Sequence, residues 1–255
     1  MSILTREPIF NLPGVVTALI AGLCAVHLAI EALPAAIGLL SLEYFSFVPA
    51  KLSLQLAPAR ALQELAELDA EDLTLLAETS RFVWITPLSY AFLHANWTHL
   101  GVNAVTLAAF GAPVARRLGA PRFLAFFAVT AVAGAAAHFL AHPFDTGPVV
   151  GASASISGAM AAIARFAFQP GGALGEPAGL GDRRGDASDG LPALLANRRA
   201  AFFLGSWLLA NLIFGLLAPA PGGVGAIAWE AHVGGFLAGL MLFGWFDPPT
   251  RKTSA

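Results

Sequence analysis

Charge is scarce in this sequence. Only 12% of the 255 residues are Asp, Glu, Lys or Arg, whereas a soluble domain usually carries about 25%. This shortage argues against an ordinary soluble enzyme, and a hydrophobic content of 57% argues against a disordered chain. The net charge is only −2, so no overall basic field is available to bind nucleic acid.

Cysteine is nearly absent as well. Cys24 is the only one in the sequence, so a disulfide framework within the chain is excluded. Because Cys24 lies in an apolar run, we expect it to act as a small packing residue.

Long apolar runs take the place of charge. The core of a bilayer is about 30 Å thick and needs about 20 apolar residues in a helix. We predict six membrane-spanning helices, at residues 14–30, 88–115, 123–140, 149–168, 200–218 and 226–246. The first is not taken for a signal peptide, because no clear cleavage pattern follows it and five more spans do. The expected fold is an all-α membrane protein, a six-helix bundle forming one domain over residues 1–255.

The basic residues indicate how the bundle is oriented. If both termini are cytoplasmic, the other side of the membrane keeps only Lys51, Arg60 and Arg81. The remaining basic residues then lie in or beside cytoplasmic segments, as the positive-inside rule requires. We expect a multi-pass protein of a cell membrane, with a bacterial inner membrane as the favoured location.

Two long connections separate the predicted spans. Residues 31–87 interleave acidic residues with leucines, which predicts either short amphipathic helices at the outer interface or an ordinary capping loop. Residues 169–199 are rich in Gly, Asp and Arg near their middle, which is typical of a flexible cytoplasmic linker.

Polar residues gather near the outer ends of three predicted spans. A polar group at membrane depth is costly, so each of them needs a structural or functional explanation. The second span carries His99 and Asn103, whose spacing puts them on one helix face. The fourth carries Ser153 and the sixth carries His232. At about 1.5 Å per residue, Ser153 and His232 both lie roughly 6–10 Å below the outer surface. We therefore expect the three helices to bring these side chains to a similar depth.

This set of residue types suits acyl transfer. A serine becomes a nucleophile when a histidine removes its proton, which makes Ser153 and His232 a candidate pair. His99 and Asn103 can donate hydrogen bonds to the oxyanion of a tetrahedral intermediate. Spacing alone leaves a second interpretation open, because a serine in a membrane helix commonly bonds to a nearby carbonyl.

Small residues favour a close approach of the helices that carry the pair. Gly151 and Ala152 precede Ser153, and Gly235 and Gly239 follow His232 in a G-x-x-x-G pattern. Faces of this kind let helix backbones pack closely.

The other polar residues in or near the spans have simpler expected roles. We expect a structural role for His94 near the helix start, and a hydrogen bond from the Ser155 hydroxyl back to a carbonyl of its helix. Ser157 either faces His232 or packs against its neighbours. His27 and His138 are expected to pack without partners, Glu230 to be solvated or to cap its helix, and His142 and Asp145 to be solvated.

At these positions the sequence resembles the rhomboid intramembrane serine proteases. The resemblance rests on His94-x4-His99-x3-Asn103, on Gly151-Ala152-Ser153, and on Ala231-His232-x2-Gly235-x3-Gly239. It implies a six-helix bundle with a water-filled cavity that opens outward and holds a Ser153–His232 dyad. It also implies an oxyanion site at His99, Asn103 and the Ser153 backbone amide, next to Gly151. Relatives of this kind cut transmembrane protein substrates within the lipid bilayer, near its outer face, and need neither a metal nor a cofactor.

The sequence departs from the family at three places. Ala154 follows the serine where glycine is common, Ser157 stands where many members stack an aromatic ring on the base, and Ile85 follows Trp84 where many have arginine. Two other classes stay open: a non-catalytic rhomboid-like binding protein and a small polytopic transporter. A transporter often shows two related halves, and no such repeat is visible here.

Overall fold

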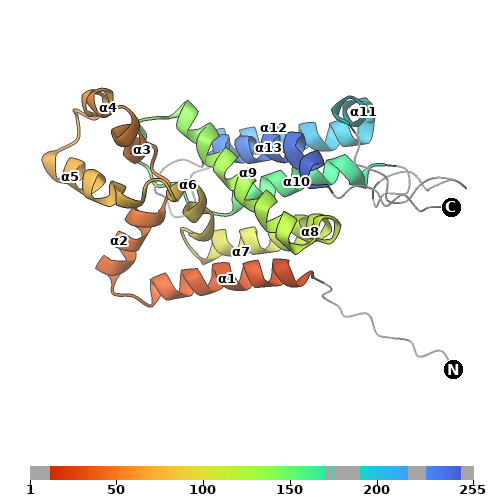
Figure 1. The fold of residues 1–255 in the computed structure, drawn as a ribbon, viewed down its shortest axis with the longest axis horizontal. Coiled ribbons are helices and arrows are strands. Elements are labelled where there is room, and N and C mark those ends of the chain that lie inside the picture. The colour runs from red at the N-terminus through yellow and green to blue at the C-terminus, as the bar shows by residue number, and fades with distance from the viewer. Residues whose placement is uncertain (1–11, 170–173, 175–189, 218–227, 248–255) are drawn as a thin grey trace, which may run out of the picture.

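The computed structural model describes residues 12–169, 174, 190–217 and 228–247 (Figure 1). Within these ranges the chain forms helices and no strand, and the one strand-like contact is an isolated antiparallel bridge between Phe47 and Val149. The expectation of an all-α protein is confirmed.

Two of the described helices have both the length and the apolar composition of a membrane span. They are α1 (Gly14–Glu31) and α9 (Ala120–Ala141). The other long helices are α10 (Ser153–Ala167), α12 (Arg198–Leu217) and α13 (Trp229–Phe246). With 15 residues, α10 is only about 22 Å long, and α13 carries Glu230 and His232. Length and composition therefore identify two of the six predicted spans.

The core of the bundle is a close contact of α9, α10 and α13. A Cβ added at Gly235 would collide with the backbone of Ala154, and one added at Gly239 would collide with the backbone of Gly158. On the other side of α10, a Cβ at Gly158 would come within 2.6 Å of the Thr130 side chain of α9. Backbones approach this closely only where side chains are absent, which explains the small residues of these helices.

The second predicted span is not one helix, so its predicted start at residue 88 was wrong. The region contains α6 (Thr86–Ser89), the 3₁₀ turn η2 (Tyr90–Phe92), α7 (Trp97–Thr106), the π-helical turn η3 (Leu107–Gly111) and α8 (Ala112–Leu118). Asn96 caps α7 by accepting a hydrogen bond from the backbone N–H of His99 at 2.9 Å, so the helix begins there. Pro113 lacks the N–H that would continue the α-helical ladder, which accounts for the π turn before it.

The fourth predicted span also begins later than expected. Residues 149–152 precede α10 as a non-helical stretch, because Val149 pairs with Phe47 and Gly151 has a φ of +118°. Ser153 is thus the first residue of its helix rather than the fifth residue of a span. The predicted end of the fifth span at residue 218 and the start of the sixth at residue 226 lie outside the described residues.

The 31–87 segment folds into short helices, as one of its two interpretations predicted. They are α2 (Ala35–Phe45), α3 (Pro49–Leu56), α4 (Pro58–Glu64), α5 (Ala70–Thr79) and the 3₁₀ turn η1 (Ser80–Phe82). Leu65 and Leu76 are buried among them. Most of the predicted 169–199 linker lies outside the described residues; its described part includes α11 (Leu191–Ala196).

An ion pair between a buried lysine and a partly exposed glutamate supports this segment. The ammonium of Lys51 is 1% exposed and donates to both the backbone carbonyl and the carboxylate of Glu43, at 2.5 and 3.0 Å. Burial lowers the pKa of Lys51, and the Glu43 carboxylate opposes that shift. The segment is fastened to the loop after α9 as well, where Ala50 N–H donates to the Asp145 carbonyl and the Ser53 hydroxyl donates to the Pro143 carbonyl.

The glycine contacts between α10 and α13 lead to a stability prediction. Gly239→Ala should lower the free energy of unfolding by about 1–3 kcal/mol, because the added methyl group overpacks a backbone contact. Gly22→Ala is the matched control, since a Cβ at Gly22 meets nothing within 4 Å and alanine is the better helix former. Thermal unfolding in detergent measures both variants. Equal midpoints for the two would mean that α10 and α13 do not touch at Gly239.

Candidate active site

Ser153 and His232 face each other across the α10–α13 contact. Ser153 is the first residue of α10, and His232 is the fourth residue of α13. The Ser153 Oγ lies 2.8 Å from the His232 Nε2. This is the distance at which a hydroxyl donates a hydrogen bond to an imidazole nitrogen. The two residues paired in the sequence analysis are therefore in direct contact.

The stretch before Ser153 is held by groups from elsewhere in the chain. The Gly151 N–H donates to the Tyr90 carbonyl at 2.9 Å, and Val149 exchanges backbone hydrogen bonds with Phe47 at 2.8 and 3.1 Å. Tyr90 is itself fully buried and donates its hydroxyl to the Ala131 carbonyl of α9 at 2.8 Å. The 31–87 segment and α9 together fix the position from which Ser153 enters its helix.

His99 lies against this stretch. The backbone N–H of Ala95 points at the His99 Nδ1 over a long 3.5 Å contact, so Nδ1 is the acceptor and Nε2 carries the proton. A Cβ built on Gly151 would come within 2.8 Å of that Nε2 and 3.7 Å of the Ser153 Oγ. The His99 ring therefore occupies the space that only a glycine at position 151 leaves open, beside Ser153.

Asn103 lies one helical turn after His99. Its Nδ2 donates to the His99 carbonyl at 2.9 Å, which uses one of its two N–H groups. Its Oδ1 is buried without a hydrogen-bond partner in the described structure. Such a group is costly. His94 precedes α7, and its buried ring meets the His99 ring edge-on at 5.2 Å between centroids.

The structure adds one residue that the sequence analysis missed. Asn211 of α12 places its Oδ1 2.8 Å from the Nδ1 of His232, and its Nδ2 donates to the Trp229 carbonyl at 3.2 Å. The available signal was an amide in the middle of a predicted apolar span, which asks for a polar partner.

These residues share one cavity. Its volume is about 810 Å³, and its lining includes His99, Asn103, Ser153, Asn211 and His232. The cavity is large enough to admit a stretch of substrate backbone together with water. The polar residues predicted on three separate spans are thus brought to a common space.

The rim of this cavity corrects the expectation for His138 and adds partners to Glu230. Glu230 was expected to be solvated or to cap its helix; its carboxylate also lies 3.3 Å from the Nδ1 of His138 and 2.9 Å from the Nε2 of His142. His138 was expected to lack a partner, but it contacts both Glu230 and Asp145, the latter at 3.6 Å. The interaction with His138 lowers the pKa of the Asp145 carboxyl. These pairs join different helices and loops, which spacing along one helix cannot reveal.

Three further expectations can be compared with the structure. His27 packs edge-on against the Trp97 ring as expected, and its buried Nε2 lies 3.6 Å from the Glu31 carboxylate with no hydrogen bond among the described residues. Ser155 was expected to bond back to a carbonyl of its own helix, but its hydroxyl donates across to the Phe127 carbonyl of α9 at 2.8 Å. Ser157 donates to the Ser153 carbonyl at 2.7 Å, so its hydroxyl is bonded to its own helix.

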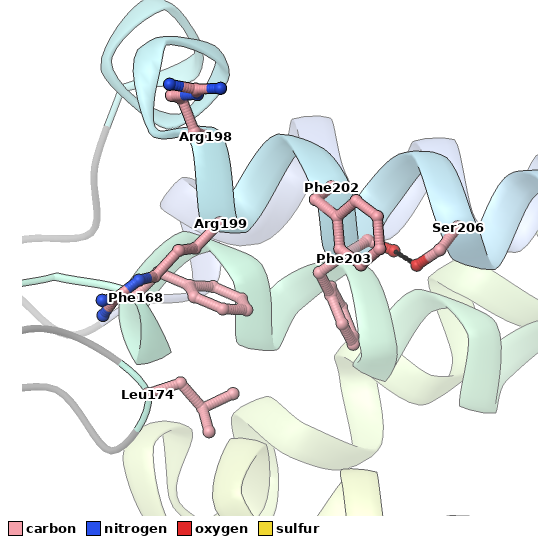
Figure 2. A pocket seen from close by; sticks show the side chains of 7 residues that line it. All are labelled: Phe168, Leu174, Arg198, Arg199, Phe202, Phe203 and Ser206. Atoms are coloured by element: carbon pink, nitrogen blue, oxygen red, sulfur yellow. Dashed lines mark hydrogen bonds between the residues drawn. The ribbon is translucent and has the colours of Figure 1, made fainter.

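A second cavity, of about 650 Å³, lies near the start of α12 (Figure 2). Seven residues line it: Phe168, Leu174, Arg198, Arg199, Phe202, Phe203 and Ser206. None of the seven is a histidine or a carboxylate, and Ser206 donates its hydroxyl to the Phe203 carbonyl. Among the described residues, Ser206 therefore has no histidine or carboxylate beside it in this cavity, whereas Ser153 contacts His232.

A comparison with protein-family models identifies the family of the chain. A family model described as Rhomboid domain matches residues 81–247, more than half of the chain, and that range contains Ser153 and His232. The chain belongs to the rhomboid family, whose members are integral membrane proteins and generally intramembrane serine proteases. A search of curated proteins found no match.

The contact between His99 and Gly151 gives a prediction about the reactivity of Ser153. Gly151→Ala should slow labelling by a fluorophosphonate probe by about 100-fold, because the methyl group would displace His99 or the stretch before Ser153. Gly119→Ala is the matched control, because Gly119 also has a positive φ (+75°) but an added Cβ meets nothing within 4 Å. The labelling rate in detergent distinguishes them. Equal slowing in both variants would mean that backbone strain alone matters at Gly151.

Proposed function

We propose that this protein is an intramembrane serine endopeptidase that cuts transmembrane protein substrates near the outer face of the membrane. Ser153 is the nucleophile and His232 is the base. The observation that supports this most directly is the 2.8 Å hydrogen bond between the Ser153 Oγ and the His232 Nε2, inside a cavity of about 810 Å³. Membership of the rhomboid family supports the same reaction.

The pair supplies each proton transfer that peptide hydrolysis needs. His232 Nε2 takes the hydroxyl proton as the Ser153 Oγ attacks the scissile carbonyl carbon. The same proton then goes to the leaving amine as the C–N bond breaks, which leaves an ester on Ser153. Water attacks this ester with His232 again as the base, and the products are a free carboxylate end and the regenerated serine. The chain's own groups carry out every step.

Three donors can stabilise the oxyanion of each tetrahedral intermediate. The first N–H groups of a helix have no partner within it, and Ser153 begins α10 at the positive end of its dipole. His99 has a proton on Nε2 beside Gly151, and Asn103 keeps one N–H after bonding to the His99 carbonyl. Preorganised donors of this kind provide a large share of the catalysis in acyl transfer.

The membrane arrangement in this proposal keeps all six spans and a single domain over residues 1–255. The spans are α1, the broken run from α7 to α8, α9, α10, α12 and α13. Both termini and the 169–199 linker are cytoplasmic, the 31–87 segment is outside, and a bacterial inner membrane is the location. The excess of arginine in the segments assigned to the cytoplasm supports this orientation. Figure 1, where α3, α4 and α5 lie at the opposite end of the molecule from α11, is consistent with it.

The pair is tested by removing each group. Ser153→Ala and His232→Ala should each abolish cleavage of a test transmembrane substrate, because neither group can act without the other. The double variant should cleave no more slowly than either single one. Proteolysis is measured in liposomes against wild type, with folding checked by thermal unfolding.

The opposite result would identify another class of protein. Cleavage near the wild-type rate in either variant would overturn the assignment of the pair. A biological activity that survives Ser153→Ala without any proteolysis would indicate a membrane-protein binding factor or a transporter.

The role of Asn103 is tested by measuring whether its removal changes kcat or KM. Asn103→Ala should lower kcat by about 10- to 100-fold with little change in KM, because a donor to the oxyanion acts only in the transition state. The control is Thr106→Ala, at a residue lining the same cavity whose hydroxyl bonds to the Val102 carbonyl at 2.6 Å. Steady-state kinetics separate the two constants. A raised KM with normal kcat would make Asn103 a docking residue.

A further inference from the structure

Asn211 lies in an apolar part of α12, between Ala210 and Leu212. An amide at membrane depth is costly unless both its ends are bonded. Here they are: the Oδ1 meets the Nδ1 of His232 at 2.8 Å and the Nδ2 meets the Trp229 carbonyl at 3.2 Å. Both partners belong to the start of α13, so the amide joins α12 to the turn that carries the base.

The chemistry of these partners fixes the direction of every hydrogen bond. The Trp229 carbonyl can only accept, so the amide end that faces it must be the NH₂ group. The Oδ1 therefore faces His232, and since it also only accepts, the His232 Nδ1 must carry a proton. In a neutral imidazole the Nε2 is then unprotonated and accepts from the Ser153 hydroxyl. This is the tautomer that a general base requires.

We propose that Asn211 is a positioning residue that holds His232 in the tautomer and ring orientation needed to deprotonate Ser153. The proposal rests on the proposed function of the Ser153–His232 pair and extends that pair to a hydrogen-bonded series of three side chains. The ring of His232 is held at both nitrogens, by α10 through Ser153 and by α12 through Asn211. Such a ring cannot rotate or exchange its tautomer without breaking one of these bonds.

An amide suits this place better than a carboxylate. When His232 takes the serine proton, the Oδ1 of Asn211 keeps accepting from Nδ1 and stabilises the cation through its dipole, without burying a second charge. Among the described residues, the other ionisable groups lining the cavity are Tyr90 of η2, His99 of α7 and the rim cluster of Glu230, His138, His142 and Asp145. Glu230 accepts from His138 and His142, and the hydrogen bonds found for the His232 ring go to Ser153 and Asn211.

The test compares two substitutions of Asn211 with a control on the same helix. Asn211→Leu is similar in size and removes both hydrogen bonds. Asn211→Asp keeps the acceptor toward His232, loses the donor to the Trp229 carbonyl and adds a charge. Ser206→Ala removes a polar group of α12 that bonds only to the Phe203 carbonyl of its own helix (Figure 2). For each variant, kcat and KM are measured per folded protein over a range of pH, together with the thermal unfolding midpoint.

We expect Asn211→Leu to lower kcat by about 10- to 100-fold with KM within about 3-fold of wild type, while Ser206→Ala leaves both constants unchanged. The expected loss is smaller than the about 10⁴-fold that follows a wrong tautomer in a triad with a charged third member. In Asn211→Asp, the carboxylate stabilises protonated His232, so the acid limb of the kcat–pH profile should move up by about one pH unit. Activity above that limb should approach the wild-type value.

A structural role for Asn211 predicts a different pattern. If Asn211→Leu keeps kcat within about 2-fold, or if Asn211→Asp slows the reaction without moving the acid limb, the proposal is wrong. The pH readout of Asn211→Asp decides the matter even if Asn211→Leu fails to fold. Failure of the proposed function itself is separately recognisable, because the wild-type protein would then show no proteolysis, or Ser153→Ala and His232→Ala would keep cleaving.

Discussion

The geometry of the candidate active site depends on the backbone contact between α10 and α13. A hydrogen bond of 2.8 Å between side chains as short as Ser153 and His232 requires their helices to lie very close. Gly235 and Gly239 allow this, because at both positions even one added carbon would collide with the backbone of α10. The same glycines would cost helix stability in water, but in an apolar bundle they let dispersion contacts and cross-helix hydrogen bonds form. The same two glycines therefore allow both the close packing of α10 and α13 and the hydrogen bond between Ser153 and His232.

A second constraint is that polar groups inside such a bundle need partners. From the Trp229 carbonyl through Asn211 and His232 to Ser153, each polar atom meets a complementary one, and the series crosses α13, α12 and α10. The stretch before Ser153 is satisfied in the same way by Tyr90 and Phe47. A side chain at the start of a helix has few neighbours of its own, so these long-range bonds determine where Ser153 points. The 31–87 segment thus contributes to the site without providing a reacting group.

The sequence predicted the parts of this structure that repeat along the chain or belong to a known pattern. Apolar runs gave the helices, and three short motifs gave the residues that line one cavity. Two predicted helix starts were wrong because contacts without any periodicity set where the helices begin. Asn96 caps α7, and Phe47 pairs with the stretch before α10. Asn211 was missed because its partner His232 is 21 residues away on another helix. The Glu230–His138 contact was missed for the same reason, since pairing between helices leaves no periodic trace.

The proposed function requires that Ser153 be a nucleophile and that His232 activate it. Its most direct test is to map a fluorophosphonate adduct by mass spectrometry on the protein purified in detergent, in wild type and in His232→Ala. We expect a single adduct on Ser153 in the wild-type protein. Without His232, the rate at which this adduct forms should fall by at least about 100-fold. An adduct on another serine, or equal labelling of Ser153 with and without His232, would contradict it.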